Sequence, residues 1–299
     1  MIKKMYTLSN KKDVQEQFAR QERRRTLLRR QVSQELPDTD LQVLDVSPAL
    51  HHSMASQARK DNTFSLPLFL SEHADDPAIE VSESVVRTSH SHLHASQPSF
   101  MRCLKDHMLS RLHNLDFDGD ECSFTPKQQN ELRLLNLDHV VEPKILRINY
   151  TTYDIRRAYD CLRPGHLSFL MTLSREDDPD RHPFWYCQLL KALHIEVDFC
   201  PGGITRSSET LEVLWVRWLG VDPAQKWGFR RCALPKVGFV PKHGDSPTFG
   251  FLDLSLVIRG CHLIPAFTDG RTDQLLQRGQ SVARQYGETD DWAGYYVNM

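Results

Sequence analysis

Long apolar runs, paired cysteines and a secretory leader are all missing from this 299-residue chain. No uninterrupted apolar stretch approaches the roughly 18 residues that a membrane-spanning helix requires. The start of the chain, Met-Ile-Lys-Lys-Met, has no apolar h-region. The seven cysteines are an odd, scattered set without a C-x-x-C pair, which is typical of reduced thiols. We therefore expect a soluble protein of the nucleus or cytoplasm, with no membrane partner.

Motifs for catalysis and metal binding are missing as well. The sequence contains no G-x-G-x-x-G, G-x-x-x-x-G-K-[ST], H-E-x-x-H or G-x-S-x-G. The acidic run 116–120 lacks the glycine and glutamate spacing of a calcium loop. The histidines at 51, 52, 90, 92 and 94 have no pattern that fixes a coordination geometry. We assign no catalytic residue, no metal site and no cofactor from the sequence.

Large aromatic side chains are scarce in the first part of the chain. Of 27 Phe, Trp and Tyr residues, seven lie in 1–140 and twenty in 141–299, including all five tryptophans. Because these rings supply much of the apolar area of a core, we expect the main folded domain after a boundary near Val141. The predicted organisation is a disordered or partly helical region 1–140, a β-barrel domain 144–270, and a C-terminal loop and helix 271–299.

The N-terminal region is expected to combine disorder with a few helices. Residues 81–100 are rich in serine and histidine and poor in large apolar groups, which indicates disorder. Helices are predicted at Lys11–Gln31, Ser99–His113 and Pro126–Leu137. The first helix carries a basic run, for which contact with nucleic acid or a nuclear localisation signal competes with the commoner explanation of a solvated helix face: Arg23, Arg24, Arg25, Arg29 and Arg30.

From residue 145 onward the pattern changes to short strands separated by Pro, Gly and Asp turns, which predicts a mainly β fold, a barrel or sandwich. The expected strands are Ile145–Tyr153, Leu167–Leu173, Trp185–Val197, Leu211–Leu219, Gly238–Pro241 and Leu256–Pro265. In Leu211–Leu219 both alternating sets are largely apolar, so this strand is expected to be central. Arg217 interrupts one of its faces.

The aromatic residues of this region suggest a ligand site. Small barrels can hold a methylated lysine between ring faces through cation–π attraction. The residues proposed for such a cage are Trp185, Tyr186, Trp218 and Trp227, with core packing as the competing explanation, above all for Trp215 and Trp218.

Two family resemblances cover the second part of the chain. His182–Leu190, Leu214–Leu219 and Val257–Leu263 resemble the strand order of bromo-adjacent homology (BAH) domains, although no lysine follows Gly260. This resemblance implies a small barrel of the BAH or SH3-like kind. Ile148–Asp154, Leu214–Gly220, Phe249–Asp253, His262–Phe267 and Asp290–Trp292 resemble, in order, the C-terminal segment of Plavaka-type transposon-encoded proteins of mushroom-forming fungi, a segment of unknown function. The carboxylate core of such a transposase would lie in upstream sequence that this chain does not contain.

These observations favour a non-enzymatic, transposon-derived protein whose barrel binds chromatin, a histone or other peptide, or nucleic acid. Two alternatives remain open. One is the remnant of a metal-dependent nuclease or transferase that uses Asp177, Asp178, Asp180 and His182. The other is a degenerate fragment without function, which the ending at Val297-Asn298-Met299, inside an apolar run, also suggests.

Overall fold

The computed structural model divides the chain into two compact units, Met1–Ser47 and Pro48–Met299. The residues that it describes all belong to the second unit: 52–54, 62–79, 99–115, 123–151, 157–165, 167–174, 182–203, 207–225, 227, 233–242 and 247–298. The predicted helix Lys11–Gln31 and the serine- and histidine-rich stretch before residue 99 lie outside these ranges.

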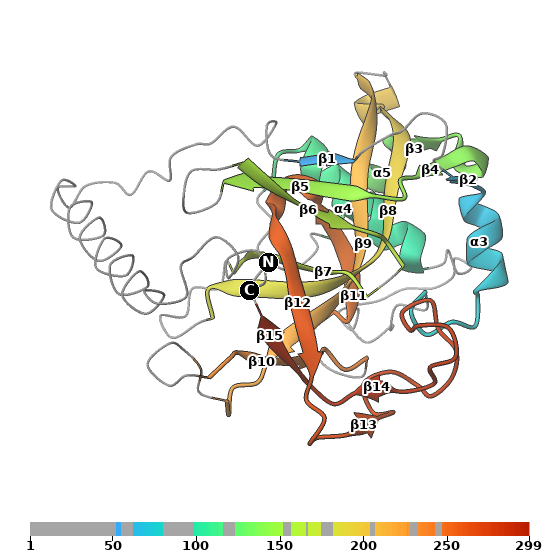
Figure 1. Ribbon diagram of the computed structural model, residues 1–299. Helices are drawn as coiled ribbons and strands as arrows, with labels where there is room; N and C mark the ends of the chain where they lie inside the picture. The colour runs from blue at the N-terminus through green and yellow to red at the C-terminus, as the bar shows by residue number, and fades with distance from the viewer. Residues whose placement is uncertain are drawn as a thin grey trace, which may run out of the picture. The chain divides into compact units, whose positions relative to one another are not determined.

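The described part of the chain is mainly β, as the sequence predicted (Figure 1). Its helices are α3 (Leu66–Glu72), α4 (Ser99–Leu112) and α5 (Pro126–Gln129), with 3-10 turns η3 (Leu137–His139), η4 (Pro201–Gly203) and η6 (Leu254–Leu256). The strands are β1 (His52–Met54), β2 (Asn62–Phe64), β3 (Leu132–Leu135), β4 (Val140–Glu142), β5 (Leu146–Thr151), β6 (Arg157–Leu162), β7 (Phe169–Leu173), β8 (Phe184–Phe199), β9 (Ser207–Val221), β10 (Lys236–Phe239), β11 (Phe249–Asp253), β12 (Val257–Pro265), β13 (Arg271–Thr272), β14 (Asp291–Trp292) and β15 (Tyr295–Asn298). None of the described helices has the length and apolarity needed to cross a membrane.

Two long strands, β8 and β9, organise the sheet. They pair antiparallel from Tyr186↔Leu219 to Phe199↔Ser207, with one register shift between Leu189 and Lys191. The second edge of β9 pairs with β11 and then with β10. The prediction that Leu211–Leu219 forms a central strand is therefore confirmed, because β9 has neighbours along both edges and apolar side chains on both faces.

The strand pairings form a closed circuit. Antiparallel ladders join β8 to β9, β9 to β10, β10 to β15, β15 to β12, β12 to β7, and β7 back to β8. One hydrophobic cluster takes its buried side chains from these strands: Phe169, Met171, Tyr186, Leu219, Val237, Phe239, Tyr295 and Val297. The assignment of this arrangement to a BAH-like barrel is a narrower statement and stays a prediction.

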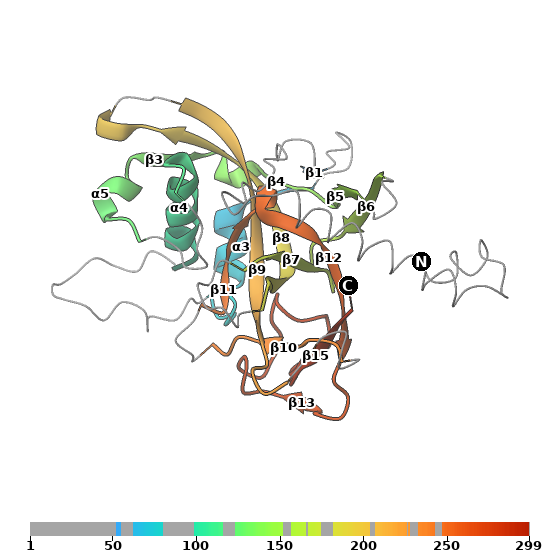
Figure 2. The ribbon, with the colours of Figure 1, turned by 90° about the vertical axis from the view of Figure 1, so that its left-hand side faces the viewer.

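Helices α3 and α4 pack on one face of β8 and β9 (Figure 2). The ring of Phe100, on α4, lies edge-on to Trp215 and Phe251, with centroid distances of 5.2 and 5.1 Å. Further along α4, Leu104 and Met108 are completely buried in the same cluster. Leucine and methionine side chains therefore bury apolar surface in this part of the chain, and a count of aromatic residues does not detect this contribution to the core.

The core extends across the expected boundary near Val141. Strand β4 spans that position, and β2 and β3 join the same sheet as β8. In addition, the Asp76 carboxylate accepts hydrogen bonds from the Ser281 hydroxyl and the Val282 amide, at 2.7 Å each. A boundary near Val141 does not divide the described residues into separate cores.

Two predicted helices require correction. Pro126–Leu137 is helical only to Gln129, where a capping box between Thr125 and Gln128 starts α5, and it continues as β3. The C-terminal helix predicted within 271–299 is wrong, because this segment forms β14 and β15. Over so few residues, the spacing of Trp292, Tyr295 and Tyr296 does not distinguish a helix from a strand. Strands β10 and β12 provide the backbone hydrogen-bond partners that make this segment a strand.

Arg217, on β9, is completely buried between two hydrophobic clusters. Its two terminal nitrogens donate to the two oxygens of Asp291, both at 2.9 Å, and its guanidinium lies 3.8 Å from the centroid of the Phe239 ring. Arg284 donates to the same carboxylate at 2.9 and 3.3 Å, and also to the carbonyls of residues 276, 277 and 279. This arginine–aspartate–arginine triad attaches the C-terminal segment to the central strand.

Replacement of Asp291 by Ala should destabilise the protein by about 3–5 kcal/mol, because two buried guanidinium groups lose their common carboxylate. The matched control is Asp290→Ala, which removes a partly exposed ion pair with Arg271 and should cost about 1 kcal/mol or less. Urea unfolding monitored by tryptophan fluorescence measures both changes. Similar losses for the two variants would contradict the role given to the triad.

The triad also predicts a pH dependence. Burial alone would raise the pKa of the Asp291 carboxyl, but the hydrogen bonds and charges of Arg217 and then Arg284 outweigh it and leave this pKa below its ordinary value. The stabilisation is therefore complete above the unfolded-state pKa of about 3.9 and is lost as the pH falls through the lower folded-state pKa. The difference in unfolding free energy between the wild type and Asp291→Asn should shrink below about pH 4. A difference that stays constant from pH 7 to pH 3, or grows in acid, would contradict this assignment.

Candidate functional site

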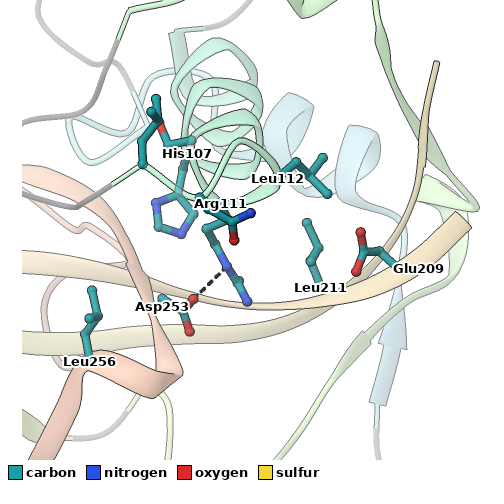
Figure 3. Close-up of a pocket in the computed structure, with 10 residues that line it drawn as sticks. His107, Arg111, Leu112, Glu209, Leu211, Asp253 and Leu256 are labelled. Carbon is teal, nitrogen blue, oxygen red and sulfur yellow. Dashed lines mark ion pairs between the residues drawn. The ribbon is translucent and has the colours of Figure 1, made fainter. Parts of the chain in front are cut away.

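A surface cleft of about 570 Å³ lies between the end of α4, the beginning of β9 and the end of β11 (Figure 3). This volume is within the range of roughly 300–1,000 Å³ found for ligand sites. The residues that line the cleft are His107, Ser110, Arg111, Leu112, Asn114, Leu115, Glu209, Leu211, Asp253 and Leu256. The lining therefore combines aliphatic and charged side chains.

The C-terminal end of α4 fixes the residues on one side of the cleft. The amide of Leu115 donates to the carbonyl of Ser110, and the amide of Asn114 donates to the carbonyl of Arg111, both at 2.9 Å. Asn114 has a left-handed backbone with φ of 52°. This is the Schellman arrangement that ends many helices, and asparagine tolerates its left-handed position better than most residues. It holds Ser110 and Arg111 at the cleft.

Arg111 is already neutralised inside the cleft. Its Nε lies 2.7 Å from Oδ2 of Asp253, and one of its terminal nitrogens donates to the backbone carbonyl of Glu212. The other carboxylate oxygen of Asp253 accepts from the amide of Ser255 at 2.8 Å. Figure 3 shows the guanidinium directed toward Asp253 from the helix above the strands. The ion pair joins α4 to β11 and leaves neither charge in excess.

Glu209 carries the remaining charge of the cleft. Its exposed carboxylate lies beyond Leu211 from Asp253, and no ion pair connects it to another of the described residues. The hydroxyl of Ser110 is buried and has no hydrogen-bond partner in the described part of the chain. Apart from His107, the lining has one positive and two negative groups, a net charge of −1. Aliphatic side chains with a single excess carboxylate suit a ligand that has an apolar stem and a cationic end.

The residues predicted for chemistry from the sequence are mostly outside this site. Arg23, Arg24, Arg25, Arg29 and Arg30 lie outside the described residues, as do Asp177, Asp178 and Asp180. His182 is described, and its Nε2 is 2.8 Å from the Tyr186 hydroxyl. Across the described ranges, no three or more His, Cys, Asp or Glu side chains are grouped so that they could hold a metal ion.

The four rings proposed for a methyl-lysine cage do not all share one accessible face of the sheet. Tyr186 is completely buried in the cluster that it forms with side chains of β7, β9, β10 and β15, so its ring faces are inaccessible. Strand alternation places Trp185 on the opposite face of β8, where Cys187 pairs across the ladder with Trp218. Trp227 is 37% exposed and stands edge-on to His182, with a centroid distance of 4.5 Å.

Core packing, the alternative to the cage, holds for Trp215 and in part for Trp218. Trp215 is 1% exposed and lies between α4 and the sheet. Trp218 is half-buried and packs against a cluster on the other face, close to the backbone of Gly250, where an added Cβ would lie 2.8 Å from the indole nitrogen. A side chain at position 250 would therefore displace this ring.

The sequence did not indicate the cleft residues as a group. Helix Ser99–His113 was predicted and is confirmed as α4, so the face that carries His107, Ser110 and Arg111 could be anticipated. Their partners are far away in the chain, since Asp253 follows Arg111 by 142 positions. Strand β11 was not predicted, and no local pattern indicates which acidic residue meets the helix.

Comparison with known proteins gives no match, whether with a protein-family model, a curated protein or a solved structure. The resemblances to BAH domains and to Plavaka-type proteins therefore stay predictions from the sequence. The functional argument rests on the cleft itself.

Proposed function

We propose that this protein is a non-enzymatic binding module whose cleft between α4 and β9–β11 accepts a lysine or arginine side chain of a peptide partner. The observation that carries the proposal is the single uncompensated carboxylate, Glu209, at the end of a cleft whose other charges form the Arg111–Asp253 pair. A cationic side chain would bring the net charge of the lining to zero.

The shape of the lining supports the same ligand. Leu112, Leu211 and Leu256 provide apolar surface for the methylene stem of lysine or arginine. The Ser110 hydroxyl is a hydrogen-bond acceptor for the ammonium or guanidinium group. A basic peptide therefore satisfies both the apolar and the polar part of the lining.

Of the partners expected from the sequence, peptides fit this cleft better than nucleic acid. A phosphate group would meet the Glu209 and Asp253 carboxylates, and like charges repel strongly in a partly enclosed cleft. A lysine-rich histone tail is one peptide with the required chemistry, which is consistent with a chromatin partner and with localisation in the nucleus. The transposon-derived origin has no bearing on this argument.

Glu209→Gln should weaken the binding of a fluorescein-labelled, alanine-rich peptide with one central lysine by roughly fivefold, because one partly exposed ion pair is lost. Fluorescence anisotropy with the full chain measures the dissociation constant. The matched control is Glu72→Gln, which removes an exposed carboxylate from α3. We also expect Glu209→Lys to bind a peptide with a central glutamate in preference to the lysine peptide.

Two results would contradict the proposal. One is an absence of binding by the wild type at low ionic strength, where attraction between exposed charges is strongest. The other is an equal loss of affinity in Glu209→Gln and Glu72→Gln, which would indicate diffuse electrostatics instead of recognition in the cleft.

A further inference from the structure

A small sheet formed by β1, β5 and β6 lies on the side of β8–β9 away from α3 and α4 (Figures 1 and 2). Its strands are antiparallel, with β5 in the centre. Leu146 and Ile148 point inward and are completely buried against side chains of β8 and β9. Because side chains alternate along a strand, the residues between them belong to the opposite, outward face.

The outward face combines a cation with an accessible aromatic ring. Arg147 pairs across the ladder with Cys161, and Asn149 pairs with Tyr159. The Tyr159 side chain is 59% exposed, and the Arg147 guanidinium lies 4.9 Å from the centroid of its ring. An exposed ring held beside a guanidinium is a surface on which a planar base can stack.

Two more cations lie at one end of this face. Lys144 precedes β5 and Arg163 follows β6, and both line a second cleft of about 440 Å³ together with Asn62, Glu142, Pro143, Ile145 and Pro164. The acidic group in this lining is already paired, because Oε1 of Glu142 is 2.9 Å from Nζ of Lys191. The second cleft therefore has a net positive charge.

Nearby acidic groups do not neutralise the outward face either. Asp160 lies on β6, but alternation directs it inward, where it accepts from the amide of Gly260 at 3.1 Å and pairs with Arg259 at 3.4 Å. In the described ranges, no ion pair involves Lys144, Arg147 or Arg163. The half-buried or buried cations of Arg111, Arg217 and Lys236, by contrast, each have a carboxylate partner.

We propose that the outward face of β5–β6 and the adjoining second cleft bind single-stranded nucleic acid. Lys144, Arg147 and Arg163 contact phosphates, and Tyr159 stacks on a base. This site is separate from the peptide cleft, and the proposal does not depend on it. A single strand fits better than a duplex, because its bases are free to expose their faces to Tyr159.

The test measures the binding of fluorescein-labelled oligo(dT) of roughly 12 nucleotides to the full chain across a series of NaCl concentrations. Three phosphate contacts predict a slope of about −2 in log K against log [NaCl], at about 0.7 per neutralised phosphate. The triple variant Lys144→Gln, Arg147→Gln, Arg163→Gln should lose most of this slope. Tyr159→Ala should weaken binding by roughly tenfold with little change in slope.

A charge-matched control is the triple variant Lys127→Gln, Arg133→Gln, Arg278→Gln, which removes three exposed cations from other parts of the protein. It should bind like the wild type. Thermal unfolding of each variant verifies that the fold is retained, which is expected because all of the substituted side chains are exposed.

An independent measurement uses the exposed Cys161, the cross-strand neighbour of Arg147. Oligo(dT) should slow the alkylation of Cys161 by iodoacetamide, followed by peptide-resolved mass spectrometry. The half-buried Cys103, on α4, serves as the internal reference and should react at an unchanged rate.

Four results would overturn the proposal. The first is equal loss of binding in the two triple variants. The second is unchanged oligo(dT) binding by the variant with Gln at 144, 147 and 163, together with a loss of binding when the arginines at 23, 24, 25, 29 and 30 are replaced. The third is unaltered alkylation of Cys161, and the fourth is equally tight binding of polyglutamate, which has charge but no bases. None of these four results would contradict the proposal that the cleft with Glu209 binds a basic peptide, so the two proposals can fail separately.

Discussion

The buried triad of Arg217, Asp291 and Arg284 is the interaction on which the rest of the structure depends. Arg217 interrupts an otherwise apolar face of the central strand, and an unpaired guanidinium at that depth would prevent packing. Asp291 compensates it from a segment more than seventy residues later, and Arg284 fixes that segment through three backbone carbonyls. The same segment supplies β15, which completes the circuit of strands. A single charged residue in β9 thus requires the C-terminal segment to dock.

The long β8–β9 ladder, once stabilised in this way, separates two surfaces of opposite charge. On one side, α4 ends at a cleft where Glu209 is in excess over the Arg111–Asp253 pair. On the other side, β5–β6 presents Arg147 and its neighbours without acidic partners. The two sides have no ligand-facing residue in common. The two proposed ligands, a basic peptide and a nucleic acid strand, would therefore not compete for the same residues.

The sequence predicted those features of the fold that local patterns determine. Alternation and turn residues located β5, β7, β8, β9, β10 and β12, and helical spacing located α4. The features that it missed depend on distant partners. The segment that forms β15 is too short for its hydrophobic spacing to distinguish a helix from a strand. It is a strand because its backbone pairs with β10 and β12. The cleft was missed for a similar reason, because Arg111 meets Asp253, and Glu209 joins the same lining, only after the sheet has formed. Alternation also places Tyr186 and Trp185 on opposite faces of β8, a consequence that counting tryptophans does not reveal.

Native-state hydrogen exchange of the β10 and β15 amides tests the central claim most directly. If the triad makes the C-terminal segment an integral part of the core, amides such as that of Val297, which donates to the carbonyl of Pro235 at 2.9 Å, should exchange only through global unfolding. Their opening free energies should then equal those of the β8–β9 amides and fall with denaturant at the same slope. Opening of β15 several kcal/mol below the global value, with a small denaturant dependence, would show that the segment detaches independently and would contradict the account.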